Sequence, residues 1–216
     1  MLAKLVGVAA GLALVASTAN ADDYIYNEHP DTYRWYEPGL TTGFGLGVQL
    51  GGGVTGFTGS TMRDSVNGDV GGLWDVRVIF GTHLPLAFEA AYLGQSAQIS
   101  TFGAPTGTLL GSTAEGDLRW NILPHHLFTP YIFAGAGYQH YGVSDIKVAD
   151  VGINSTDNLV EFPMGLGVSW RDPSGFTADL RGTYRQTVDQ NLIQNPNGTN
   201  ADLSWWEASA SLGYEF

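Results

Sequence analysis

The sequence predicts an all-β chain: an eight-stranded, antiparallel, up-and-down transmembrane β-barrel. Three observations carry this prediction. The chain begins with an export signal, its C-terminal stretch alternates between apolar and polar residues to the last position, and similar segments upstream are joined by connections that are long and short in turn. Because successive side chains of a strand point to opposite faces, each such segment has one apolar and one polar face.

Residues 1–21 have the three parts of a secretory signal peptide. Lys4 supplies the positive start, residues 5–16 form an apolar run, and Ala19-Asn20-Ala21 is a small-residue cleavage site. The apolar run is shorter than the ~20 residues that a transmembrane helix needs. The sequence therefore predicts an exported protein.

The remaining chain divides into an expected periplasmic N-terminal extension, residues 22–40, and a barrel, residues 41–216. The extension has no clean period, and its cluster of Tyr33, Trp35 and Tyr36 leaves open a role as a binding segment. Cysteine is absent, so an exported chain of this size must be stable without disulfides. The formal net charge of −12 argues against a nucleic-acid partner, which calls for a basic patch.

The last strand, residues 204–216, gives the clearest alternation in the chain. One face carries the even positions, which are mostly apolar or aromatic and end on Leu212, Tyr214 and Phe216. The other face carries Glu207 and Glu215 among small residues, together with Trp205. A long apolar strand that ends at the free carboxylate is unusual in a soluble protein, so this face is expected to meet lipid.

Seven further strands are predicted before it, at 41–57, 71–82, 86–99, 111–123, 130–143, 158–171 and 176–187. The connections between them are alternately long and short, which is typical of barrels with short periplasmic turns and longer extracellular loops. Each strand exceeds the ~9–11 residues that a tilted transmembrane strand needs. The barrel must close, because an open sheet edge in lipid would leave backbone groups without hydrogen-bond partners. In the strand at 130–143 the two faces are hard to separate.

A soluble, lipocalin-like barrel is the main structural alternative. Such a barrel would bury the apolar face and expose the charged one. Here the charged face carries both signs, and the apolar face places Trp, Tyr and Phe near strand ends, as in the aromatic girdles of membrane barrels.

Several segments resemble the OmpA-type family of small eight-stranded outer-membrane barrels. They are Gly116-Asp-Leu-Arg-Trp-Asn121, Thr129-Pro-Tyr-Ile-Phe-Ala-Gly-Ala-Gly-Tyr138, Asp179-Leu-Arg-Gly-Thr-Tyr-Arg185 and Leu212-Gly-Tyr-Glu-Phe216. The resemblance covers residues 41–216 and implies a bacterial outer-membrane location, with outer-membrane lipids and lipopolysaccharide as partners. It also implies that the barrel assembly machinery reads Leu212, Tyr214 and Phe216 as an assembly signal. The peptidoglycan-binding domain of longer members is not expected.

If the apolar face meets lipid, the charged residues of the strands point into the lumen. These candidates are Asp75, Arg77, Glu89, Glu115, Asp117, Arg119, Glu161, Asp179, Arg181, Arg185 and Glu207. Side chains fill the interior of an eight-stranded barrel, so these groups are expected to form arginine–carboxylate networks. A plugged, structural lumen and a narrow channel for ions or small solutes both remain open. The inward glycines of the first strand would leave room for a channel or for side chains of neighbouring strands.

No catalytic, metal or cofactor site is predicted. A lipid-modifying enzyme would need a nucleophile or base at the rim. His140 with Ser144 is the one candidate pair, and His125-His126 is expected to be a solvated turn. Weak divalent-cation binding near lipopolysaccharide remains open for the acidic connections. Their carboxylates are Asp64, Asp69, Asp145, Asp150, Asp157, Asp189 and Asp202. The sequence thus favours a structural or surface-interaction role, with an unidentified surface ligand.

Overall fold

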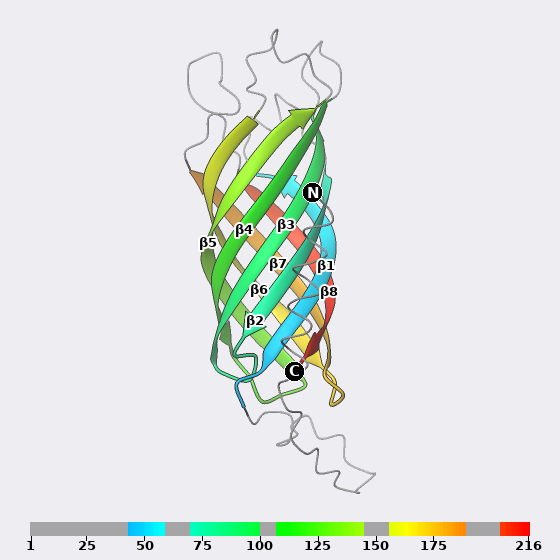
Figure 1. The fold of residues 1–216 in the computed structure, drawn as a ribbon, viewed down its shortest axis with the longest axis vertical. Helices are drawn as coiled ribbons and strands as arrows, with labels where there is room; N and C mark the ends of the chain where they lie inside the picture. The colour runs from blue at the N-terminus through cyan, green and yellow to red at the C-terminus, as the bar shows by residue number, and fades with distance from the viewer. Residues whose placement is uncertain (1–42, 59–69, 100–106, 145–155, 189–203) are drawn as a thin grey trace, which may run out of the picture.

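The computed structural model describes residues 43–58, 70–99, 107–144, 156–188 and 204–216, which form a closed antiparallel barrel (Figure 1). Its strands are β1 (Leu46–Phe57), β2 (Gly71–Phe80), β3 (Leu86–Ile99), β4 (Gly107–Asn121), β5 (Phe128–Ser144), β6 (Thr156–Arg171), β7 (Phe176–Val188) and β8 (Trp205–Glu215). Each strand pairs with its sequence neighbours, and β1 pairs with β8 to close the barrel. The predicted fold class is confirmed.

The two ends of the barrel differ in how the strands are joined. At one end, called the turn end here, residues 81–85, 122–127 and 172–175 connect β2 to β3, β4 to β5 and β6 to β7. The connections at the opposite end, called the far end, lie largely outside the described residues. The predicted signal peptide and N-terminal extension also lie outside them.

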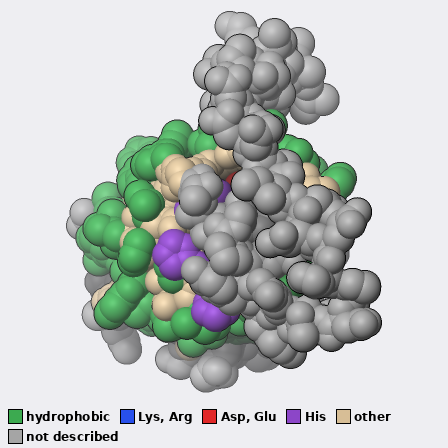
Figure 2. All heavy atoms as spheres, turned by 90° about the horizontal axis from the view of Figure 1, so that it is seen from below, with side chains coloured by type: hydrophobic (Ala, Val, Ile, Leu, Met, Phe, Trp, Pro, Cys, Tyr) green, Lys and Arg blue, Asp and Glu red, His purple; other side chains and the backbone are tan. Residues whose placement is uncertain are grey.

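Side chains alternate between the lumen and the outer surface along every strand. In β7, for example, Leu180 is exposed and its neighbour Arg181 is buried. Charged side chains on the described strands all occupy buried, inward positions, and none of the described outward-facing strand side chains is charged. Figure 2 shows hydrophobic side chains around the turn end of the barrel. This distribution is the reverse of that in a soluble barrel, and it suits an outer surface that contacts lipid.

No helix among the described residues is long and apolar enough to span a membrane.

Two strand boundaries differ from the prediction because of glycines with positive φ. Gly45 has a φ of 66°, so β1 begins at Leu46 instead of residue 41. Gly81 has a φ of 85°, which turns the chain one residue after β2 ends at Phe80. L-residues with a side chain rarely adopt such angles, whereas glycine does so without steric cost.

The boundary of β4 is also corrected. The sequence predicts a loop at residues 100–110 and a strand that begins at residue 111. In the structure β4 begins four residues earlier, at Gly107, which pairs with Ile99 of β3. Threonine and leucine continue the strand through this stretch, and the backbone groups of β3 are paired along its whole length.

Aromatic side chains on the outer surface gather toward the strand ends. Near the turn end, the ring centroids of Phe80 and Phe88 are 6.2 Å apart, and those of Tyr214 and Phe216 are 5.0 Å apart. Nearer the far end, Trp74 and Tyr92 are 5.8 Å apart. Aromatic belts of this kind mark the two membrane–water interfaces of a membrane barrel.

Replacing Leu180 with arginine is expected to lower the free energy of unfolding by about 2–4 kcal/mol, because the outward side chain lies between the two ends of β7 and would place a charge in lipid. Leu180 is 66% exposed, so the effect cannot come from a cavity in the lumen. The measurement is urea unfolding in lipid vesicles. Gln186→Arg, on the same face near the far end of β7, is the matched control with an expected loss of about 0–1 kcal/mol. Equal losses for the two variants would contradict a lipid-facing surface.

Candidate functional site in the barrel lumen

The structure places all the candidate lumen residues in buried, inward positions. Each of them makes an ion pair, and all these pairs except Arg77–Asp75 join different strands. The pairs form three groups along the lumen, which are described here from the far end to the turn end. Each group contains residues from several strands, so its ion pairs connect strands that are distant in the sequence.

The group nearest the far end is centred on Arg185, called the Arg185 group here. Its guanidinium contacts the carboxylates of Glu115 on β4, Glu161 on β6 and Glu207 on β8. The Nη1–Oε1 distance to Glu161 is 2.7 Å, and the Nε–Oε2 distance to Glu207 is 3.2 Å. Thr183 donates a further hydrogen bond to Glu207 at 2.7 Å. One cation therefore faces three carboxylates in a buried site.

The middle group contains two further arginines and their carboxylates. Arg181 contacts Glu89 through Nη1 and lies 3.0 Å from Asp117 Oδ2 through Nη2. Arg119 donates to Ser169 Oγ at 2.7 Å and lies 3.7 Å from Glu89. Glu89 is thus shared by guanidinium groups that come from β4 and β7.

The same layer continues through Asp179. Arg77 bridges Asp75, at 2.8 Å, and Asp179, at 3.1 Å. Asp179 also accepts hydrogen bonds from the Tyr131 hydroxyl at 2.8 Å and from Ser169 Oγ at 2.5 Å. Breaking one partner of a buried pair leaves an uncompensated charge, so these contacts are expected to act together.

Two aromatic rings of β5 contact the arginines of this network. Their burial also shows which face of β5 points into the lumen, which the sequence left open. Tyr131 is 1% exposed and Ile132 is 46% exposed, so the lumen face holds Tyr131 and Phe133. The Arg119 guanidinium lies 3.5 Å from the Tyr131 ring centroid, and that of Arg181 lies 3.5 Å from the Phe133 ring centroid. Cations stack favourably on aromatic faces, which explains two large rings in a charged lumen.

A third group lies at the turn end and was not among the predicted site residues. Arg171 Nε is 3.1 Å from Glu215 Oε2, and His83 in the β2–β3 connection contacts the other oxygen of Glu215. Arg171 also donates to the carbonyl oxygens of Thr82 and Pro124, each at 3.2 Å. Arg171 on β6 and Glu215 on β8 are both buried on the inward face, but no sequence signal links them to a histidine in a turn.

The inward glycines Gly51, Gly135 and Gly167 do not leave an open path through the lumen, because side chains of neighbouring strands fill the space beside them. A Cβ on Gly51 would lie 2.7 Å from a carboxylate oxygen of Asp75, and one on Gly135 would lie 2.0 Å from Asp117 Oδ1. A Cβ on Gly167 would lie 2.4 Å from the Tyr131 hydroxyl. These glycines make room for side chains from neighbouring strands.

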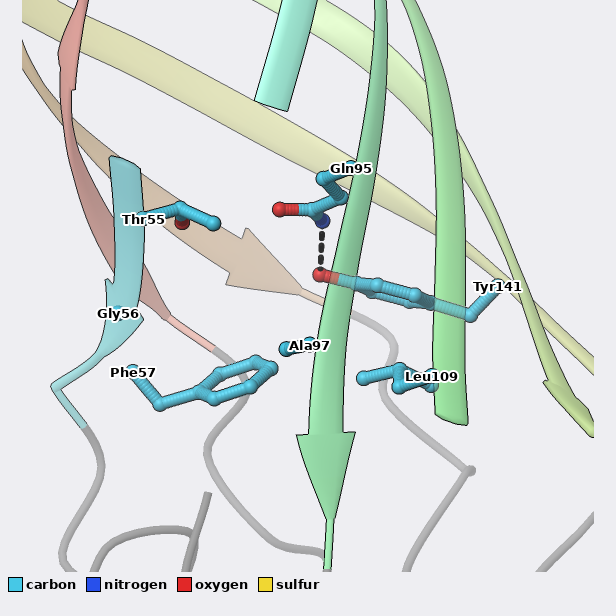
Figure 3. Close-up of a pocket in the computed structure, with 7 residues that line it drawn as sticks. All are labelled: Thr55, Gly56, Phe57, Gln95, Ala97, Leu109 and Tyr141. Atoms are coloured by element: carbon cyan, nitrogen blue, oxygen red, sulfur yellow. Dashed lines mark hydrogen bonds between the residues drawn. The ribbon is translucent and has the colours of Figure 1, made fainter. Parts of the chain in front are cut away.

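A small cavity remains at the far end of the lumen (Figure 3). Its volume of about 10 Å³ suffices for roughly one water molecule. Thr55, Phe57, Ala97 and Leu109 line it, and Gln95 donates a 2.7 Å hydrogen bond to Tyr141 at its polar side. The cavity is too small for a solute.

Of the remaining candidates, the described side chains of His125 and His140 are exposed. His140 is exposed on β5, and its Nδ1 is 2.7 Å from Asn158 Oδ1; the Ser144 side chain lies outside the described set. The His125 side chain is exposed in the β4–β5 connection. Among the described residues, no group of three or more His, Cys, Asp or Glu side chains could hold a metal ion. The side chains of the acidic far-end connections are not described.

Leu212, Tyr214 and Phe216 point outward at the turn end of β8. Leu212 is 72% exposed, and Tyr214 and Phe216 are each 39% exposed. The backbone N–H of Phe216 donates to the Leu46 carbonyl oxygen at 2.8 Å, so the last residue still pairs with β1.

Comparison with known proteins gives structural relatives only. No family model and no curated protein matches the sequence. Outer membrane protein OprG from Pseudomonas aeruginosa aligns with a TM-score of 0.55 and 12% identity, covering 80% of this chain and 96% of that one. Neisserial surface protein A gives 0.53 and 14%, covering 80% and 97%, and the attachment invasion locus protein Ail of Yersinia pestis gives 0.52 and 11%, covering 80% and 99%. The chain therefore has the fold of the small eight-stranded β-barrels of the bacterial outer membrane, as its hydrophobic outer surface also indicates.

Proposed function

We propose that this protein is a non-enzymatic outer-membrane barrel with a structural or surface-interaction role, and that the arginine–carboxylate network plugs its lumen. One observation carries the proposal. Buried ion pairs from β2, β3, β4, β6, β7 and β8 meet across the interior at successive depths. A conducting path would have to separate such pairs, and breaking a buried pair typically costs several kcal/mol.

The orientation follows from the connections. The turn end faces the periplasm and the far end faces the cell surface, since short turns are periplasmic in outer-membrane barrels. Contacts with lipopolysaccharide or with a surface ligand are then made by the far-end rim and the connections beyond it. The acidic residues of those connections suit divalent cations that bridge to anionic lipids.

A cellular experiment separates this role from a channel. Cells that lack the protein are expected to become more sensitive to detergents, while their uptake of small hydrophilic solutes stays unchanged. A channel predicts the opposite pair of results, with reduced uptake as the main effect. Re-expression of the wild-type protein is the control.

Replacing Phe216 with alanine tests the proposed assembly signal. The folded amount in cells is expected to fall several-fold, while refolding of purified protein into detergent is unchanged, because the terminal aromatic acts on the assembly machinery. Heat-dependent gel mobility measures both. Phe176→Ala is the matched control, since the Phe176 ring lies 5.6 Å from that of Tyr214 in the same outer cluster. If both variants lose folded protein equally in cells and in detergent, Phe216 has only a packing role.

A further inference from the structure

The ladder between β5 and β6 is interrupted near the middle of β6. From the turn end the pairs run as far as Ala134 with Met164, and they resume at Gly137 with Glu161 in the same register. Two pairs are missing in between. The ladders of the other seven neighbouring strand pairs are continuous over their described lengths. This gap, called the β5–β6 seam here, is thus a distinct feature of the described barrel wall.

Pro163 of β6 accounts for the gap. A proline has no backbone N–H, so it cannot donate to a neighbouring strand. The register places Pro163 opposite Gly135, and the two missing pairs are the ones that require an N–H at Pro163. The Gly135 carbonyl oxygen therefore has no ladder donor on the β6 side. Such an unpaired backbone group is costly at membrane depth, where lipid offers no hydrogen bond.

A second acceptor without a donor lies beside the first. Asp117 Oδ2 is 3.0 Å from Arg181 Nη2, whereas Asp117 Oδ1 has no hydrogen-bond partner within the described part of the chain, although Asp117 is 1% exposed. A Cβ on Gly135 would lie 2.0 Å from this Oδ1. Covalent geometry then places the Gly135 carbonyl oxygen within about 5 Å of Asp117 Oδ1. One water molecule, with its two O–H donors, can bridge oxygens at this separation.

We propose that the barrel wall opens locally at the β5–β6 seam, and that a water molecule enters there to donate to the Gly135 carbonyl oxygen and to Asp117 Oδ1. The seam opens more readily than the other strand pairs because one of its ladder hydrogen bonds is already absent. Gly135 and Gly137 also contribute no side chains that would hold β5 against its neighbours. The wall thus has a built-in opening point at the depth of the Arg181–Asp117 pair.

The test is backbone amide hydrogen exchange, measured by NMR on the purified full-length mature barrel in detergent. The amides of Gly135, Gly137 and Glu161 are expected to exchange about tenfold faster than those of Ala91 and Glu115, which pair in the uninterrupted β3–β4 ladder. A factor of about ten corresponds to the loss of one hydrogen bond. Magnetisation transfer from water to the Gly135 amide proton is expected as well.

Two kinds of variant should close the seam. Pro163→Ala restores an N–H and should slow exchange at the seam about tenfold. Leu159→Ala, at another buried position of β6, keeps its N–H and is the matched control that should not slow it. The double variant Ala134→Cys with Met164→Cys joins directly opposed residues in a chain without other cysteines. Its oxidation should slow exchange at Gly135, and reduction should restore it.

Three results would overturn the proposal. One is wild-type exchange at the seam that is no faster than in the β3–β4 ladder, or a Gly135 amide without water contact. Another is seam exchange that neither Pro163→Ala nor the disulfide slows. The third is a slowing by Pro163→Ala that is equal in every strand pair, because that would be a global gain in stability. None of these results bears on the plug, which is tested electrically.

Discussion

Replacing Arg185 with glutamine is expected to lower the free energy of unfolding by about 3–5 kcal/mol, because it leaves Glu115, Glu161 and Glu207 without their shared cation. The three carboxylates lie in a lumen where each is buried. The ring of Trp205, 4.9 Å from the Arg185 guanidinium carbon, would also lose its cation contact. Urea unfolding of the refolded protein, followed by heat-dependent mobility, measures the loss.

Two controls separate charge from packing. Gln186→Ala changes the adjacent, outward-facing position of β7 and should leave stability within about 0.5 kcal/mol of wild type. The double variant Arg185→Gln with Glu115→Gln removes one carboxylate together with the cation, so it should be more stable than Arg185→Gln alone. If Arg185→Gln were as stable as wild type, the Arg185 group would not hold the barrel together.

Replacing Arg181 with glutamine is expected to have an effect of similar size, about 3–5 kcal/mol, through a different layer. Glu89 and Asp117 would lose a shared guanidinium, and the Phe133 ring would lose the cation stacked on it. The properties of Arg181→Gln also distinguish a lumen that is permanently filled from one that opens as a gate. A structural lumen predicts a lower unfolding midpoint, whereas a gate predicts raised permeability of a barrel that stays stable.

Arg119→Gln serves as the comparison within this layer. Its ion pairs are longer, at 3.7 Å to Glu89 and 3.9 Å to Asp179, so its stability loss should be smaller than that of Arg181→Gln. A larger loss for Arg119→Gln would contradict the ranking drawn from the distances.

Much of the fold follows from the two-residue period of the sequence. In β6 and β8 the alternation alone separates outward Leu166 and Leu212 from inward Glu161 and Glu207. In β5 both faces hold large apolar residues, so the alternation does not show which face is inward. Tyr131 and Phe133 point inward because of contacts with other strands, which the sequence pattern does not reveal. They pack against arginines that come from β4 and β7.

The sequence also does not predict which charged residues form ion pairs with one another in the lumen. Alternation gives each charged residue a face, but the pairing of Arg181 with Glu89 depends on how the closed barrel brings β3 and β7 to the same depth. The group of His83, Arg171 and Glu215 was missed for the same reason, because His83 belongs to a connection with no period. Strand ends were misplaced where Gly45 and Gly81 adopt positive φ values, which composition does not reveal.

The plugged lumen is tested most directly by conductance across a planar lipid bilayer, using mature protein whose folded state is verified by heat-dependent gel mobility. The ion pairs that cross the lumen predict a silent bilayer with folded protein present. Discrete, reproducible current steps from the folded wild-type protein would contradict the plug and would make this barrel a narrow channel.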